Sequence, residues 1–213
     1  MEEQGRIKLQ RMTLGPVETN TYLVSREGVA EAMVFDPADR GDWIAQRAQE
    51  QGLHITRILL THAHFDHIGG VAALVSVTGA EVIACAEERE LCEDAGMNLS
   101  RDMGVPITLQ DVRYCADGAV IGDAGLSCRL IATPGHTAGG CCYYFEQDHI
   151  LICGDTLFAG SVGRTDFPTG SMSTLIRSIR ERLLVLPEDT ICYPGHGDET
   201  SIGEEKRYNP FLS

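Results

Sequence analysis

Several features that mark other classes of protein are missing from this chain of 213 residues. No apolar run approaches the ~18 residues that cross a bilayer, so we expect no membrane segment. Residues 1–6 lack the apolar core of a secretory signal, and we therefore expect a cytoplasmic protein. No linker, low-complexity stretch or repeat interrupts the sequence, which favours a single domain over residues 1–213.

Basic residues are scarce as well. The chain has 17 lysines and arginines against 31 aspartates and glutamates, which gives a formal charge of −14. Such a surface repels the phosphate backbone of nucleic acids and anionic lipid head groups. We therefore expect neither a nucleic acid nor a membrane among the partners of this protein.

The eight cysteines include no Cys-x-x-Cys pair, and the only close pair is Cys141 and Cys142. Most lie inside apolar segments, as Cys153 does after Leu151 and Ile152. We interpret them as small buried hydrophobic residues that stay reduced in a cytosol. A redox role for Cys141 or Cys142 is the alternative.

The spacing of apolar residues predicts an α/β protein. Strands are expected at 7–14, 19–25, 32–35, 56–60, 80–84 and 190–193, with further short strands and tight turns between 110 and 153. Helices are expected at 40–51, 69–78, 86–101, 172–184 and within 200–213. Ser171 or Ser173 is expected to cap the helix at 172–184. Two face-to-face sheets with helices outside would accommodate this order.

The most informative segment is 61–67, with the sequence Thr-His-Ala-His-Phe-Asp-His. Four groups that bind divalent cations fall within six residues: His62, His64, Asp66 and His67. Their spacing does not match one face of a helix, so we interpret the segment as a loop that curls around ions. It directly follows an apolar strand, as active-site loops of layered α/β proteins often do.

Three more candidate ligands lie just past apolar strands: His136 after 130–132, Asp155 after 151–153 and His196 after 191–193. Neighbouring strands end at one edge of a sheet, so these side chains can meet the 61–67 segment. Seven ligands are too many for one ion, which takes about four. They suit two ions that share a bridging carboxylate and a nucleophilic hydroxide. Imidazole and carboxylate without thiolate favour zinc, iron or manganese. His54 and His149 stand alone, and we interpret them as surface residues.

The pattern His-x-His-x-Asp-His, followed by a distant His, Asp and His, resembles that of the metallo-β-lactamase superfamily, and all seven positions match. Within it, the chain resembles the short glyoxalase II-like (hydroxyacylglutathione hydrolase-like) proteins. The supporting stretches are 18–24, 154–158, 162–168 and 209–212, so the resemblance runs through nearly the whole chain.

This resemblance implies a four-layer αββα sandwich of two mixed β-sheets flanked by helices. It implies that His62, His64 and His136 hold one metal, that Asp66, His67 and His196 hold the other, and that Asp155 bridges both. Zinc is the first expectation, with iron or manganese as alternatives. Asp66 would also orient the attacking hydroxide. The implied reaction is hydrolysis of a small thioester, first of all an S-2-hydroxyacylglutathione such as lactoylglutathione.

The resemblance does not extend to one part of the family's substrate pocket. Longer glyoxalase II enzymes bind glutathione with an added C-terminal helical region, whereas this chain ends soon after His196. Arg164 is the candidate contact for a substrate carboxylate, and an ion pair with Asp166 is the alternative interpretation. The oligomeric state is not indicated by the sequence.

Two other reactions compete with thioester hydrolysis. Persulfide dioxygenases share the stretch Gly-Arg-Thr-Asp-Phe at 163–167 and use one iron, held by groups that correspond to His62, His136 and Asp155. They commonly carry His-Asp-Tyr where this chain has His-Gly-Asp at 196–198. The third possibility is lactone hydrolysis by the same metal centre.

Overall fold

The computed structural model describes residues 5–123 and 125–212. The N-terminal half forms a six-stranded sheet of β1 (Ile7–Leu14), β2 (Thr19–Arg26), β3 (Glu31–Phe35), β4 (His54–Leu59), β5 (Glu81–Cys85) and β6 (Val112–Cys115), in that order. Neighbours are antiparallel from β1 to β3 and parallel from β3 to β6. Parallel neighbours need crossover connections. These contain α1 (Gly41–Glu50), then α2 (Phe65–Ile68) and α3 (Val71–Thr78), then η1 (Ala86–Glu88) and α4 (Arg89–Glu93).

The C-terminal half forms a second six-stranded sheet of β7 (Val120–Asp123), β8 (Leu126–Ala132), β9 (Cys141–Phe145), β10 (Ile150–Gly154), β13 (Ile191–Pro194) and β14 (Thr200–Ser201). Its spatial order is β14-β13-β10-β9-β8-β7, and only the β10–β13 pair is parallel among these strands. The β10–β13 crossover contains the hairpin β11 (Leu157–Phe158) and β12 (Ser161–Val162), then α5 (Met172–Ser178) and the π-helical η2 (Ile179–Leu183). The helix α6 (Ile202–Tyr208) follows β14.

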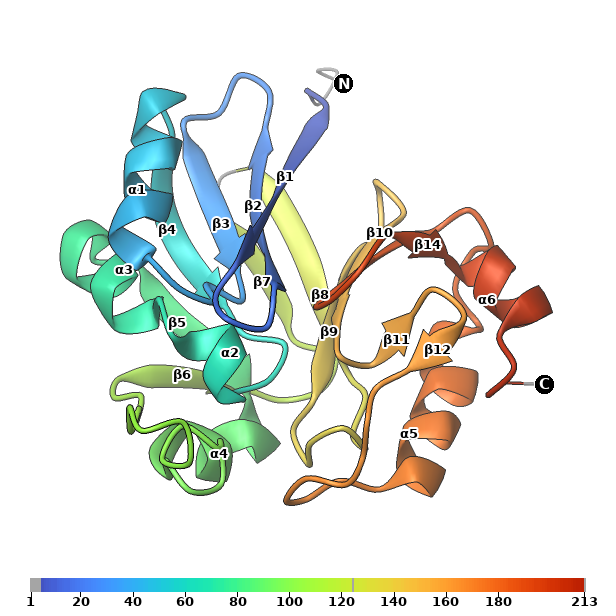
Figure 1. The fold of residues 1–213 in the computed structure, drawn as a ribbon. Helices are drawn as coiled ribbons and strands as arrows, with labels where there is room; N and C mark the ends of the chain where they lie inside the picture. Colours follow the sequence, from blue (N-terminus) through green and yellow to red (C-terminus); the bar gives the residue numbers. More distant parts are fainter. Residues whose placement is uncertain (1–4, 124, 213) are drawn as a thin grey trace.

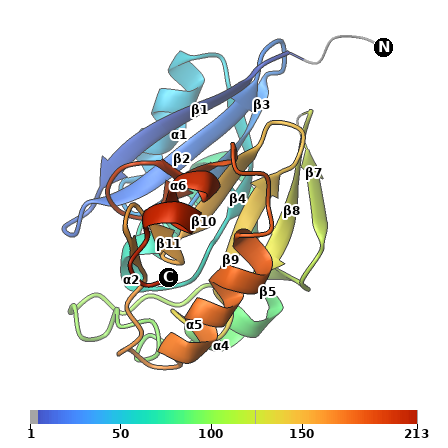
Figure 2. The same ribbon diagram turned by 90° about the vertical axis from the view of Figure 1, so that its right-hand side faces the viewer.

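The two sheets pack face to face, with α1 and α3 on one outer side and α5 and α6 on the other (Figure 1). Figure 2 shows α5 lying across the outer face of the second sheet. The predicted four-layer αββα sandwich of two mixed sheets is therefore confirmed. Among the described residues, no helix combines the length and apolarity that crossing a bilayer would require.

Alternation along the strands builds three apolar layers. In β3, Met33 and Phe35 enter the layer between the sheets, whereas Val34 packs with residues of α1 and α3. In β9, Tyr143 enters the layer between the sheets, whereas Tyr144 packs against α5 and η2. Because successive side chains of a strand point to opposite faces, strands buried on both faces connect all three layers.

Two predicted helices differ from the structure, one in extent and the other in type. The helical region expected near 86–101 ends at Glu93, and turns follow it. The buried Asn98 amide donates to the carbonyl oxygens of Leu91 and Ile107, at 2.9 Å each, and such side-chain bonds compete with helix continuation. The helix expected at 172–184 changes to π-helix after Ser178, although Ser171 caps its start as expected, accepting from the Thr174 N–H.

Arg26 at the end of β2 joins the first sheet to the second. Its side chain is only 7% exposed and pairs at 2.7 Å with Asp148 in the β9–β10 turn. The guanidinium also donates to the carbonyl oxygens of Gly5 and Gly125, at 2.7 and 2.8 Å. One side chain therefore holds three separate segments of the chain.

Candidate metal centre

The seven predicted ligands lie together at one end of the two sheets. His62 and His64 follow β4, Asp66 and His67 lie on α2, and His136, Asp155 and His196 follow β8, β10 and β13. The expectation of a loop over 61–67 was only half right, because α2 begins directly after His64. The N–H of Phe65, its first residue, donates to the Asn98 carbonyl at 2.9 Å, and the turn itself is closed by the His67 N–H, which donates to the His64 carbonyl at 2.9 Å.

His62, His64 and His136 form a compact group of buried imidazoles. The Nε2 atom of His136 lies 3.0 Å from His64 Nδ1 and 3.2 Å from His62 Nε2. Nitrogens bound at 2.0–2.1 Å to a tetrahedral zinc are about 3.3 Å apart, so the triangle has the right size for one ion. His136 Nδ1 donates to the Arg164 carbonyl at 2.7 Å, which leaves the Nε2 lone pair for the centre of the group.

Asp66, His67 and His196 form the second group. Asp66 Oδ2 lies 3.5 Å from His67 Nε2 and 3.3 Å from His196 Nε2. Asp155 lies between the groups, with Oδ1 3.4 Å from His67 Nε2 and Oδ2 3.7 Å from His136 Nε2. The carboxylate is therefore placed where a ligand common to two ions would have to lie.

Burial and neighbouring charges together set the pKa values of the clustered histidines. It lowers the pKa of His62 well below its usual value, with His67 and His136 adding to the effect. Burial and then His136 lower the pKa of His64 to about 3. Both imidazoles are therefore neutral at physiological pH, which is the form that binds metals. Burial alone would also lower the pKa of His67, but Asp66, Asp155 and Asp36 raise it.

Two atoms in the cluster fit a bound cation particularly well. His67 Nε2 and Asp155 Oδ1 are buried, and neither has a hydrogen-bond partner among the described residues. A buried polar atom without a partner costs about 1–3 kcal/mol. A cation between these two atoms would satisfy both, so the residues present match the divalent ions that their pattern predicts.

Asp36 supports this cluster and was missed by the sequence analysis. The N–H and hydroxyl of Thr61 donate to its carboxylate at 2.8 and 2.6 Å, and His67 Nδ1 donates to it at 3.0 Å. These bonds fix the ring of His67 so that Nε2 faces the other ligands, as outer carboxylates do at metal sites. Its position in the sequence could have identified it, because Asp36 directly follows β3 just as other residues of the cluster follow their strands.

Glu88 is a second buried carboxylate that the sequence analysis missed. It accepts hydrogen bonds from the Ala63 N–H at 2.8 Å, the Thr137 hydroxyl at 2.8 Å and the Gly139 N–H at 3.0 Å. Burial raises the pKa of Glu88 to about 7, against the effect of these three donors. Glu88 thus ties the connection that carries His62 and His64 to the one that carries His136.

Gly195 is required by close packing around the predicted bridge. A Cβ atom at this position would overlap Asp155 Oδ1 and approach the ring of His67. Any larger residue would displace Asp155 and His67, which explains a glycine directly before His196.

A pocket of about 260 Å³ opens onto the centre and is lined by His64, Asp66, His136, Asp155 and His196 together with Val17, Phe65, Leu99, Arg164 and Phe167. Arg164 forms a bidentate pair with Asp166, at 2.8 and 2.7 Å, and its guanidinium lies 3.9 Å above the Phe167 ring. The structure thus contains the ion pair considered as the alternative for Arg164. Contact with a substrate carboxylate stays a prediction.

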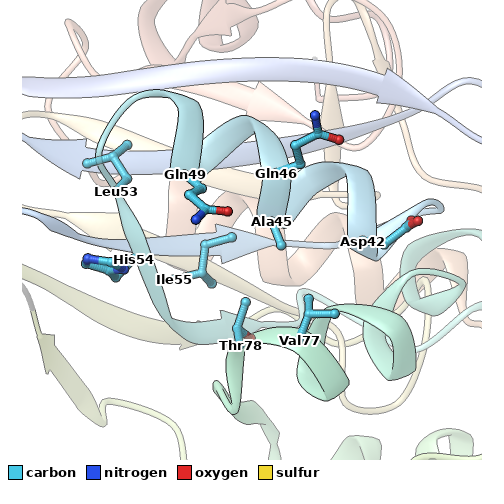
Figure 3. A pocket seen from close by; sticks show the side chains of 9 residues that line it. All are labelled: Asp42, Ala45, Gln46, Gln49, Leu53, His54, Ile55, Val77 and Thr78. Atoms are coloured by element: carbon cyan, nitrogen blue, oxygen red, sulfur yellow. The ribbon is translucent and has the colours of Figure 1, made fainter.

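A larger hollow of about 390 Å³ lies between α1 and α3 (Figure 3). Its lining includes Asp42, Gln49, His54 and Thr78 but none of the predicted ligands. His54 therefore lines a different hollow from the candidate ligands, five of which line the smaller pocket.

Comparison with known sequences agrees with this geometry. The family model described as "Metallo-beta-lactamase superfamily" matches residues 14–196. The probable metallo-hydrolase YqgX of Bacillus subtilis is 38% identical over 213 residues, covering 97% of this chain and 98% of YqgX. The hydroxyacylglutathione hydrolase GloC of Haemophilus influenzae is 36% identical over 185 residues, covering 85% of this chain and 87% of GloC.

Solved structures show the same fold. The B3 metallo-β-lactamase BLEG-1 superposes with a TM-score of 0.90 at 36% identity, covering 97% of this chain and all of that one. The di-iron form of TTHA1623 gives 0.84 at 37% identity, covering 95% of this chain and 100% of that chain. ETHE1 from Myxococcus xanthus gives 0.77 at 30% identity, covering 95% and 83%. By ligand geometry, sequence and fold, the chain belongs to the metallo-β-lactamase superfamily.

Proposed function

We propose that this protein is a dinuclear metal-dependent hydrolase of small thioesters, with an S-2-hydroxyacylglutathione as the first candidate substrate. The observation that carries the proposal is the pair of three-residue ligand groups with Asp155 between them. The similarity to GloC, which is named a hydroxyacylglutathione hydrolase, supports the substrate class.

In this proposal His62, His64 and His136 hold one ion, Asp66, His67 and His196 hold the other, and Asp155 contacts both. The ions, zinc first and iron or manganese as alternatives, would polarise the thioester carbonyl and supply hydroxide near neutral pH. Asp66 accepts a 2.7 Å hydrogen bond from Thr19, which fixes its carboxylate to orient the attacking water. A thiolate is a good leaving group even when it is not protonated. The C–S bond can therefore break in this scheme without a general acid to protonate the sulfur.

The direct test is hydrolysis by the metal-loaded protein, followed through the released thiol. We expect lactoylglutathione or another small thioester to be cleaved with two divalent ions per chain. Chelation should abolish the activity, and zinc, iron or manganese should restore it. Failure to cleave any small thioester at full metal occupancy would rule the function out.

A mononuclear iron persulfide dioxygenase is the second candidate. It is favoured by the stretch 163–167 and by the similarity to the ETHE1 structure. Metal analysis combined with an oxygen electrode separates the two proposals, because one iron per chain with oxygen uptake on glutathione persulfide supports only the dioxygenase. Homoserine lactones in the same hydrolysis assay test the lactonase alternative.

Replacing Glu88 with alanine should weaken metal binding at the three-histidine group. Loss of the three hydrogen bonds separates the connection that carries His62 and His64 from the one that carries His136. Substitution of residues that hold metal ligands in place lowers metal affinity by about 10–100-fold. Competition for zinc with a chromophoric chelator measures the change. The matched control is Glu90→Ala, on the exposed side of the same segment, which should bind zinc like the unaltered protein. Equal affinity in both variants would refute the role given to Glu88.

A further inference from the structure

Leu99 has a backbone conformation that large side chains avoid. Its φ is +69°, in the left-handed region. Glycine and asparagine adopt this region readily, whereas a bulky apolar residue there is an outlier. Residues held in such conformations are concentrated at functional sites, where the surrounding structure enforces them.

The residues on either side of Leu99 enforce its conformation, because Asn98 and Ser100 are both fully buried. The Asn98 side chain bonds Leu91 and Ile107, and its Oδ1 accepts from the Ser100 N–H at 3.0 Å. The Ser100 hydroxyl accepts from the Ile107 N–H at 2.8 Å. The chain is thus fixed immediately before and after Leu99.

The same turn is joined directly to the metal centre. The Asn98 carbonyl accepts from the N–H of Phe65, the first residue of α2, which carries Asp66 and His67. Leu99 itself is only partly buried, and its side chain lines the 260 Å³ pocket. Its position relative to the second ligand group is therefore set by one short connection.

The pocket wall beyond the ligands is mainly apolar. Val17, Phe65, Leu99 and Phe167 contribute to it. Arg164 is the cation of this lining, and Asp166 already binds it through two hydrogen bonds. A negatively charged substituent placed against this wall would also be repelled by the negative field of a chain with formal charge −14.

We propose that Leu99 is a specificity-determining residue, held in a strained conformation so that its side chain binds an apolar substituent next to the scissile thioester. This inference rests on the proposed function and adds a substrate feature to it. The favoured thioesters carry an alkyl or aryl group beside the reacting carbonyl or sulfur. Leu99 contributes binding and takes no part in the chemical step.

The test is the variant Leu99→Asn, because asparagine tolerates a positive φ but offers no apolar surface. Two substrate series are needed. One varies the 2-hydroxyacyl group on a fixed thiol from methyl to isobutyl to phenyl, and the other varies the thiol on a fixed acyl group from polar to apolar. In the unaltered protein we expect kcat/KM to rise by about threefold or more for each buried carbon in at least one series.

In Leu99→Asn we expect that rise to disappear through a higher KM, with kcat nearly unchanged, since binding common to ground and transition states is lost. The melting temperature should increase by about 2–4 °C, because the strain is relieved. A merely structural Leu99 would not combine higher stability with weaker binding of apolar substrates. Leu99→Gly, which is also free at positive φ, serves if the asparagine variant does not fold.

Arg40→Asn is the matched control. Arg40 has a φ of +50°, is exposed at the start of α1 and does not line the pocket, so its replacement should leave both substrate series unchanged. The inference fails if the unaltered protein shows no preference for apolar groups, or if Leu99→Asn keeps that preference. If the unaltered protein cleaves no thioester at full metal occupancy, the proposed function itself fails and this inference with it.

Discussion

Replacing Asp155 with alanine should lower thioester hydrolysis by more than about 1,000-fold, because several kcal/mol of charge stabilisation depend on both ions. Its carboxylate lies within 3.7 Å of a histidine nitrogen of each ligand group, so it alone is proposed to contact both ions. We expect at most partial loss of folding, since Asp155 follows the end of β10 and leaves the apolar layers intact. Thiol release, metal content and circular dichroism measure the three effects.

Asp189→Ala is the control for this experiment. Asp189 is an exposed carboxylate that pairs with His149, and neither residue lines the pocket. It should retain the metal content and activity of the unaltered protein. An Asp155→Ala protein with two ions and full activity would contradict the shared-ligand assignment.

Replacing Arg26 with alanine should have the largest effect on stability, a loss of about 3 kcal/mol in the free energy of unfolding. The substitution leaves Asp148, whose side chain is 17% exposed, without its cation. It also removes a donor from the carbonyl oxygens of Gly5 and Gly125. A loss of this size is a large fraction of the 5–15 kcal/mol that typically stabilises a domain. Urea denaturation measures it.

An exposed ion pair provides the comparison. Arg47 and Glu50 pair at 2.9 Å on the surface of α1, with about half of each side chain exposed. Pairs of this kind contribute about 0.2–1 kcal/mol. Arg47→Ala should therefore lose much less stability than Arg26→Ala, and similar losses in the two variants would contradict the role given to Arg26.

The side chains that gather at the candidate metal centre could be selected from the sequence because their signal is local. Each lies next to an apolar strand, and the segment 61–67 concentrates four of them. Asp36 and Glu88 are different, since each contacts the 61–67 segment from 25 positions away. Half of the hydrogen bonds that their carboxylates accept come from backbone N–H groups, which every residue except proline carries, so the side-chain sequence does not indicate these contacts.

The fold class followed from alternating apolar residues, but helix ends did not. The apolar spacing near 86–101 continues past Glu93, while Asn98 diverts the backbone through contacts with Leu91 and Ile107. A single asparagine in an apolar repeat does not by itself indicate where a helix ends. The same diversion places Leu99 at the pocket, a position that propensity alone cannot reveal.

The eight thiols are all buried, and burial raises the pKa of Cys85 and Cys92 to about 12. Cys141 and Cys142 are both buried and enter different apolar layers, which favours the interpretation as small buried hydrophobic residues over a redox role for either thiol. A brief pulse of an alkylating reagent would therefore leave native molecules unmodified and label those that have opened. The number of alkylated thiols per molecule, counted by mass spectrometry, would then distinguish local unfolding of one strand from global unfolding of the sandwich. The natural cysteines serve as the probes, so no engineered label is needed.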